Sequence, residues 1–156
     1  MNAESIWLDL EQTIIASFGN PELCNVQKIG AFLQANNVSE VGIFSFAIWN
    51  EADQHEFEKH IKPTIELALD VHVVTWPTVQ NMMKADFEYT GVRFDTAWEV
   101  SEFIQLRGKM GAFEHFIRSR RPNFIRAVLI DDVVTDTTIT NRKTGQTIEF
   151  WNVDNL

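Results

Sequence analysis

Residues 6–13, IWLDLEQT, carry the pattern that decides the fold. An apolar run leads directly into Asp9, and because it is too short for a helix, residues 6–10 are predicted to form a buried strand. Asp9 stands at the carboxyl end of this strand and is followed by Glu11 and Thr13. In an open parallel sheet, ligands bind at that end of the strands. Further strands ending in polar side chains would complete such a binding edge.

Three more apolar segments have the length of buried strands: 41–46 (VGIFSF), 71–76 (VHVVTW) and 127–130 (AVLI). Stretches with helical spacing alternate with them at 26–34, 51–69, 79–87 and about 98–118. This order predicts a three-layer, Rossmann-like α/β domain, a parallel sheet with helices on both faces. After Asp136, two β-rich runs flank a polar turn at 143–145, which predicts a C-terminal β-hairpin. No linker or repeat is apparent, so residues 1–156 are expected to form a single domain.

The length, hydrophobic content and net charge of the chain limit the classes of protein to which it can belong. The chain has 156 residues and 45% hydrophobic content, enough for one core. We see no secretory signal and no apolar run of roughly 20 residues, so a cytoplasmic protein without membrane contact is expected. The net charge of −9 opposes broad nucleic-acid binding. A local exception to this negative charge is the basic cluster of Arg118, Arg120 and Arg121. The cluster is either a phosphate contact or a solvated helix end.

Polar residues follow several of the predicted strands. Asp9 follows the first, Ser45 lies near the end of the second, and Asp131-Asp132 follows the fourth, with Asp136 shortly after. If the strands are parallel, these ends lie on one edge of the sheet, so carboxylates far apart in sequence should meet there. Converging carboxylates repel one another unless a cation joins them.

Magnesium is the cation that suits this set of ligands, because it typically binds one or two carboxylates together with waters and a phosphate. Lys109 would add a fixed positive charge, which makes a phosphoryl group the natural ligand. Each residue also has an ordinary structural interpretation taken singly: an Asp at a strand end often caps a helix, Ser45 can be a buried hydroxyl, and Lys109 can be solvated. Their order and placement together favour a site.

That order resembles the haloacid dehalogenase superfamily of phosphohydrolases, over nearly the whole chain. The resemblance implies a role for each motif residue: Asp9 as nucleophile, Glu11 as general acid and base, Thr13 in the turn that follows, Ser45 and Lys109 as the second and third motifs, and Asp131 with Asp132 as the fourth.

The implied activity is magnesium-dependent hydrolysis of a phosphomonoester through an aspartyl-phosphate on Asp9. The metal would be held by Asp9, by Asp131 or Asp132, and by the backbone carbonyl of Glu11. Ser45, Lys109 and Thr13 would contact the phosphoryl group. We expect little or no inserted cap domain. In this superfamily an open site accompanies large substrates such as phosphoproteins or nucleic-acid ends, or a cap supplied by a second subunit. The expected substrate is therefore a nucleotide, a nucleic-acid end or a phosphoprotein.

Two departures leave an alternative open. Most phosphatases of the superfamily have Asp at the position of Glu11 and Gly at the position of Gln12. A catalytically weak or inactive protein that binds phosphate or nucleotide is therefore the second interpretation. A receiver-type signalling domain also has an acidic pocket, but its acidic pair comes early in the chain and this one comes late.

Two tryptophans stand at or just beyond strand ends on the proposed edge. Trp49 and Trp76 would stack on a nucleobase or another aromatic group of the substrate, or else fill the core. The histidines give no metal motif, since the pair His55 and His60 has spacing i, i+5 and does not share a helix face.

Overall fold

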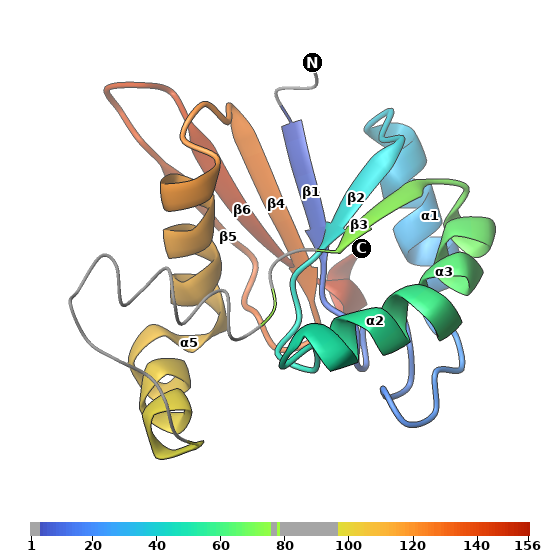
Figure 1. Cartoon of the computed structure of the whole chain (residues 1–156). Helices are drawn as coiled ribbons and strands as arrows, with labels where there is room; N and C mark the ends of the chain where they lie inside the picture. Colours follow the sequence, from blue (N-terminus) through green and yellow to red (C-terminus); the bar gives the residue numbers. More distant parts are fainter. Residues whose placement is uncertain (1–3, 76–77, 79–96) are drawn as a thin grey trace.

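The structure is a computed structural model that describes residues 4–75, 78 and 97–156, with side chains for 5–75, 78 and 108–156. Its centre is a six-stranded sheet of order β3-β2-β1-β4-β6-β5 (Figure 1). The strands are β1 Glu4–Leu8, β2 Glu40–Ile43, β3 His72–Thr75, β4 Arg126–Asp131, β5 Thr137–Thr140 and β6 Thr147–Asn152. All neighbouring pairs are parallel except β5 and β6, which pair antiparallel. The predicted α/β class with a mostly parallel sheet is confirmed.

The four strands predicted from apolar runs are all present, displaced by a few residues. β1 ends at Leu8, so Asp9 lies just beyond it, where its amide still donates to the carbonyl of Ile130 on β4 (3.0 Å). β6 was not among the four strands predicted from apolar runs for the parallel sheet. It pairs with β5 on one side and in parallel register with β4 on the other, from Arg126↔Thr147 to Asp131↔Asn152.

In the described part of the chain, four α-helices connect the strands: α1 Val26–Ala35, α2 Glu51–His60, α3 Lys62–Leu69 and α5 Ala97–Arg120. A single helix was expected over 51–69, and the structure has two. Pro63, near the start of α3, has no amide hydrogen, and in a continuous helix its ring would collide with the carbonyl of Lys59, so the first helix ends at His60. The helix expected at 79–87 lies outside the described residues.

α5 is also interrupted where one continuous helix was predicted. Gly108 has φ 62 and ψ 176, a non-helical conformation that glycine adopts at little cost. Lys109 is therefore the first residue of the second helical stretch. Within the described residues, no helix combines the length and the apolar character needed to cross a membrane.

Successive side chains of a strand belong to two different apolar clusters of the core. Ile6 and Leu8 belong to one cluster, which includes side chains from α1, α2 and α3. Trp7, between them in sequence, belongs to the other cluster, with Phe113 and Phe116 of α5. Successive side chains of a strand point to opposite faces, so the two clusters lie on opposite faces of the sheet. Figure 1 shows α1 and α3 beside the β2–β3 half of the sheet and α5 beside the β4–β6 half.

Candidate functional site

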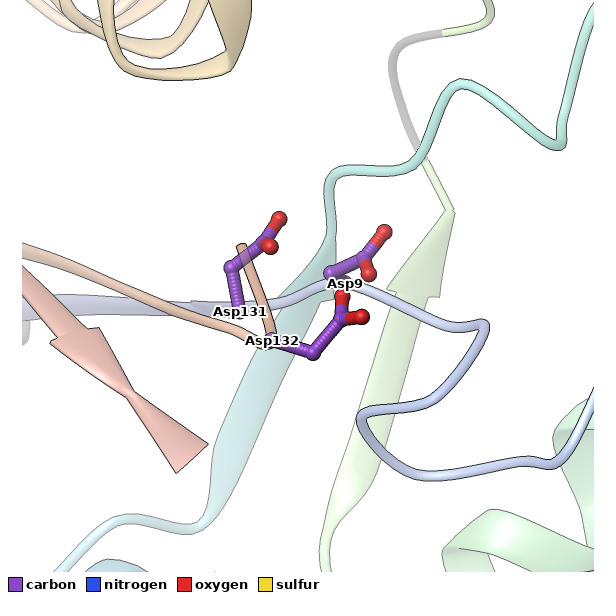
Figure 2. A group of neighbouring side chains, drawn as sticks. All are labelled: Asp9, Asp131 and Asp132. Atoms are coloured by element: carbon purple, nitrogen blue, oxygen red, sulfur yellow. The ribbon is translucent and has the colours of Figure 1, made fainter. Parts of the chain in front are cut away.

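The structure brings three carboxylates together at the carboxyl ends of β1 and β4. Asp9, Asp131 and Asp132 each offer an oxygen such that these atoms all lie within 4.8 Å of one another (Figure 2). Asp9 and Asp131 are buried, and Asp132 is half-buried. The parallel pairing of β1 with β4, which aligns Leu8 with Ile130, places the two chain segments side by side. The expected meeting of residues more than a hundred positions apart therefore occurs.

Lys109 supplies a positive charge to this acidic cluster. Its Nζ lies 2.9 Å from Asp9 Oδ1 and 3.3 Å from Asp131 Oδ2. The ammonium group also lies over the rings of Phe44 (5.5 Å) and Phe46 (4.7 Å). Only 11% of the lysine side chain is exposed, so its charge acts on the carboxylates with little screening by water. No motif indicated a role for the two phenylalanines, although they flank Ser45.

Asp9 is held from two sides. Lys109 donates to one carboxylate oxygen, and the buried hydroxyl of Thr13 donates to the other at 3.2 Å. The backbone carbonyl of Thr13 in turn accepts a hydrogen bond from the side chain of Asn25 (2.9 Å). Thr13, expected near the phosphoryl group, thus also orients the carboxylate of Asp9.

The electrostatics of the cluster disfavour three ionised carboxylates. Burial raises the pKa of Asp131, and the charge of Asp9 raises it further, while Lys109 acts in the opposite direction. Burial, together with the charges of Asp131 and Asp9, raises the pKa of Asp132 to about 6. One lysine is therefore not enough to neutralise the group at pH 7.

A hard divalent cation fits the arrangement. Asp131 Oδ2 is buried and lies at ion-pair distance from Lys109, but no donor among the described residues is aligned for a directed hydrogen bond to it. The other oxygen of Asp131 accepts a hydrogen bond from the amide of Val133 (2.8 Å). The free acceptor and the excess negative charge are what a magnesium ion with oxygen ligands would satisfy.

Ser45 lies at the same edge of the sheet. The amide of Phe44 donates to the carbonyl of Leu8 at 2.9 Å, so the residues that follow, Ser45 and Asp9, leave their strands side by side. The Ser45 side chain is buried, and its oxygen accepts a hydrogen bond from the amide of Ala47 (3.1 Å). Among the described residues, the Ser45 hydroxyl donates to no acceptor.

Glu11 does not join the carboxylate cluster. It is exposed, and its Oε2 accepts a hydrogen bond from the amide of Phe18 at 2.8 Å. Its neighbour Gln12 has φ 61, in the left-handed region where glycine is favoured. The side chain of Gln12 donates to the carbonyl of Ala16 (2.7 Å), which stabilises this backbone turn.

Asp136 and Trp49, the two further candidate residues that the structure describes, make other contacts. Asp136 is not part of the cluster, because its carboxylate accepts hydrogen bonds from the amide of Asn152 and the side chain of Asn155. Trp49 is partly buried and packs against the apolar core cluster that contains Phe113 and Phe116 of α5. Trp76 lies outside the described residues.

Comparisons with protein-family models, with curated proteins and with solved structures found no match for this chain.

Proposed function

We propose that the chain is a magnesium-dependent phosphomonoester hydrolase of the haloacid dehalogenase type, acting through an aspartyl-phosphate on Asp9. The single observation that carries the proposal is the convergence of Asp9, Lys109, Asp131 and Asp132 at one edge of the sheet. The same proposal includes the three-layer Rossmann-like arrangement and the C-terminal hairpin. Apolar clusters on two faces of the sheet and the antiparallel pairing of β5 with β6 support that description.

In the first chemical step, an oxygen of Asp9 attacks phosphorus and the bond to the leaving oxygen breaks. Glu11 donates its proton to that oxygen, which leaves as an alcohol. In the second step, the Glu11 carboxylate takes a proton from water, the water oxygen attacks phosphorus, and the bond to Asp9 breaks. The products are inorganic phosphate and the restored Asp9 carboxylate.

Other residues of the site would lower the barrier to phosphoryl transfer by stabilising negative charge. Lys109 and the hydroxyl of Ser45 would stabilise negative charge on the phosphoryl oxygens. Asp9, Asp131 and Asp132, with the backbone carbonyl of Glu11, would hold magnesium. The bound cation would screen the anionic nucleophile from the anionic substrate.

The proposed substrates are nucleotides, nucleic-acid ends or phosphoproteins, because the site is expected to be open. The segment between Thr13 and β2 contains one helix, α1, and the segment between β2 and β3 contains α2 and α3, which leaves little room there for an inserted cap. A protein that binds phosphate with little or no turnover is the second candidate. The hydrogen bond of Glu11 to the Phe18 amide favours it, since that carboxylate must reach the leaving oxygen to act.

Phosphate release from an aryl phosphate, with and without magnesium, tests the proposal. The wild-type chain is expected to release phosphate only with magnesium, and Asp9→Asn is expected to be inactive while keeping the wild-type circular dichroism spectrum. Glu11→Gln, which can still accept from Phe18, should slow turnover by at least about 100-fold. Equal phosphate release by wild type and Asp9→Asn would contradict the proposed hydrolase activity. Magnesium-dependent stabilisation by inorganic phosphate without turnover would support the second candidate.

A further inference from the structure

A second charged region lies at the opposite end of the sheet. The segments 118–126 (RSRRPNFIR) and 141–147 (NRKTGQT) contain no acidic residue, although the chain as a whole has a net charge of −9. Six of the 13 Lys and Arg residues of the chain belong to these two segments: Arg118, Arg120, Arg121, Arg126, Arg142 and Lys143. We call this region the basic end.

The fold joins the two segments. The side chain of Gln146 donates to the carbonyls of Pro122 (2.9 Å) and Phe124 (2.8 Å), and the amide of Thr147 donates to the carbonyl of Ile125 (2.9 Å). The loop between β5 and β6 is thereby fixed against the turn between α5 and β4, and Figure 1 shows both at the same end of the sheet. Sequence alone indicated only the cluster at the end of α5, because the contribution of the β5–β6 loop depends on this long-range contact.

Five of the six basic side chains belong to exposed residues: Arg118, Arg120, Arg121, Arg142 and Lys143. Arg126 is partly buried and is used internally, by Glu149 and by Asn36. Arg118 forms an ion pair with Glu114 at 3.1 Å, an exposed contact that a stronger anion can replace. The exposed acids Glu40 and Asp70 lie toward the β2–β3 half of the sheet, across β1 from β4.

Arginine dominates the exposed set, and this favours phosphate as the ligand. The planar guanidinium group binds phosphate oxygens through two parallel hydrogen bonds. The aromatic side chains of this region do not offer a surface for bases: Trp7 and Phe124 are both buried, and Arg121 covers the ring of Trp7 at 5.7 Å. Single-strand binding generally uses exposed aromatic rings that stack on bases.

We propose that the basic end binds the phosphate backbone of a nucleic-acid duplex without reading its sequence. The binding surface is distinct from the proposed phosphohydrolase site. β4 runs from Arg126, at the basic end, to Asp131, in the carboxylate cluster. Six residues of strand span roughly 15–20 Å, so the two regions do not share one phosphate group. The inference goes beyond the proposed hydrolysis and does not depend on it.

Fluorescence anisotropy with a labelled duplex of random sequence tests the inference. The test variant is the double substitution Arg142→Gln with Lys143→Gln, in an exposed loop. The matched control is Lys28→Gln with Lys59→Gln, two exposed lysines on α1 and α2 that change the net charge equally. The wild-type chain is expected to bind at low salt and to lose affinity as salt rises. The test variant should bind more weakly and lower the slope of log K against log salt by about 2.

Three outcomes would overturn the inference: no binding at low salt, an equal loss in the control variant, or equally effective competition by polyglutamate or by anionic lipid vesicles. The last result would assign the surface to another kind of polyanion. Phosphate release from an aryl phosphate should be the same in wild type and in the test variant. Loss of duplex binding and loss of hydrolysis are therefore separate results.

Discussion

Lys109 and Asp9 are 100 residues apart in the chain, yet the lysine Nζ lies 2.9 Å from Asp9 Oδ1. The same ammonium group lies 3.3 Å from Asp131, so one buried cation faces two buried carboxylates. Lys109 begins a new helical stretch directly after the break in α5 at Gly108. The balance of charge at the site therefore depends on how the fold places Lys109. The ion pairs of Lys109 should contribute to the stability of the protein.

Replacement of Lys109 by methionine should destabilise the protein strongly in metal-free buffer. Removing one partner of a buried ion pair leaves uncompensated charge and costs about 3–5 kcal/mol. Magnesium should recover part of this loss, and should raise the melting temperature of the variant more than that of wild type. The control is Lys28→Met, an exposed lysine whose loss should change the free energy of unfolding by no more than about 0.5 kcal/mol. Equal melting temperatures for the two variants would contradict the ion-pair geometry.

The raised pKa of Asp132 predicts an unusual dependence of stability on pH. In the folded chain the pKa is about 6, against 3.8 ordinarily, so between these values the folded state binds more protons than the unfolded state. The free energy of unfolding in metal-free buffer should therefore fall as pH rises from about 4 to 6. Asp132→Asn should reduce this fall and be more stable than wild type at pH 7.

The raised pKa of Asp131 acts in the same direction, so some pH dependence should persist in Asp132→Asn. Urea unfolding at a series of pH values measures the effect. A control variant, Glu40→Gln, changes the net charge by the same amount at the opposite end of the sheet. It separates a local interaction from a general effect of net charge. An unchanged pH profile in Asp132→Asn would show that the carboxyl group is not held among other negative charges.

Gln12 provides a test of the backbone turn after β1. Its φ of 61 is costly for side chains branched at Cβ, so Gln12→Val should lower the free energy of unfolding by about 1–2 kcal/mol. Gln12→Gly loses the hydrogen bond to Ala16 but adopts this conformation freely. The glycine variant should therefore be more stable than the valine variant in urea, and should keep any phosphate release that wild type shows. Equal stability of the two would indicate that the turn is not left-handed.

Much of the fold could be predicted because its signals are local. The alternation of Trp7 with Ile6 and Leu8 reflects two buried faces, and the short apolar runs mark the parallel strands. The meeting of Asp9 with Asp131 follows from a general rule, that the carboxyl ends of parallel strands share an edge. These residues could be placed together without knowing which strands are neighbours.

Other features depend on contacts between distant segments and could not be predicted. Asp136 lies at the predicted edge, because it is hydrogen-bonded to Asn152, which pairs with Asp131 at the carboxyl ends of β6 and β4. Hydrogen bonds from Asn152 and Asn155 hold its carboxylate there, outside the carboxylate cluster. The position of β6 between β4 and β5 likewise follows from pairing across the sheet. The hydrogen bond that the Glu11 side chain accepts from the amide of Phe18 is a contact within the loop that no motif indicated.

Gly42 is a position where the packing of the sheet leaves no room for a side chain. It faces Trp7 on β1, and a methyl group at Gly42 would overlap the indole ring. The ring cannot easily move away, because it packs edge-on against Phe116 at 5.1 Å and Phe113 at 6.4 Å. Gly42→Ala should therefore lower the free energy of unfolding by about 1–3 kcal/mol, measured in urea.

Gly19→Ala is the matched control for this substitution, since nothing lies within 4 Å of the added methyl group. Its free energy of unfolding should stay within about 0.5 kcal/mol of wild type. A second test combines Gly42→Ala with Trp7→Leu, whose smaller side chain leaves room for the methyl group. If overlap with the ring is the cause, the two substitutions should cost less together than the sum of their separate costs. Additive costs would mean that Gly42 is required for its backbone and not for the space it leaves to Trp7.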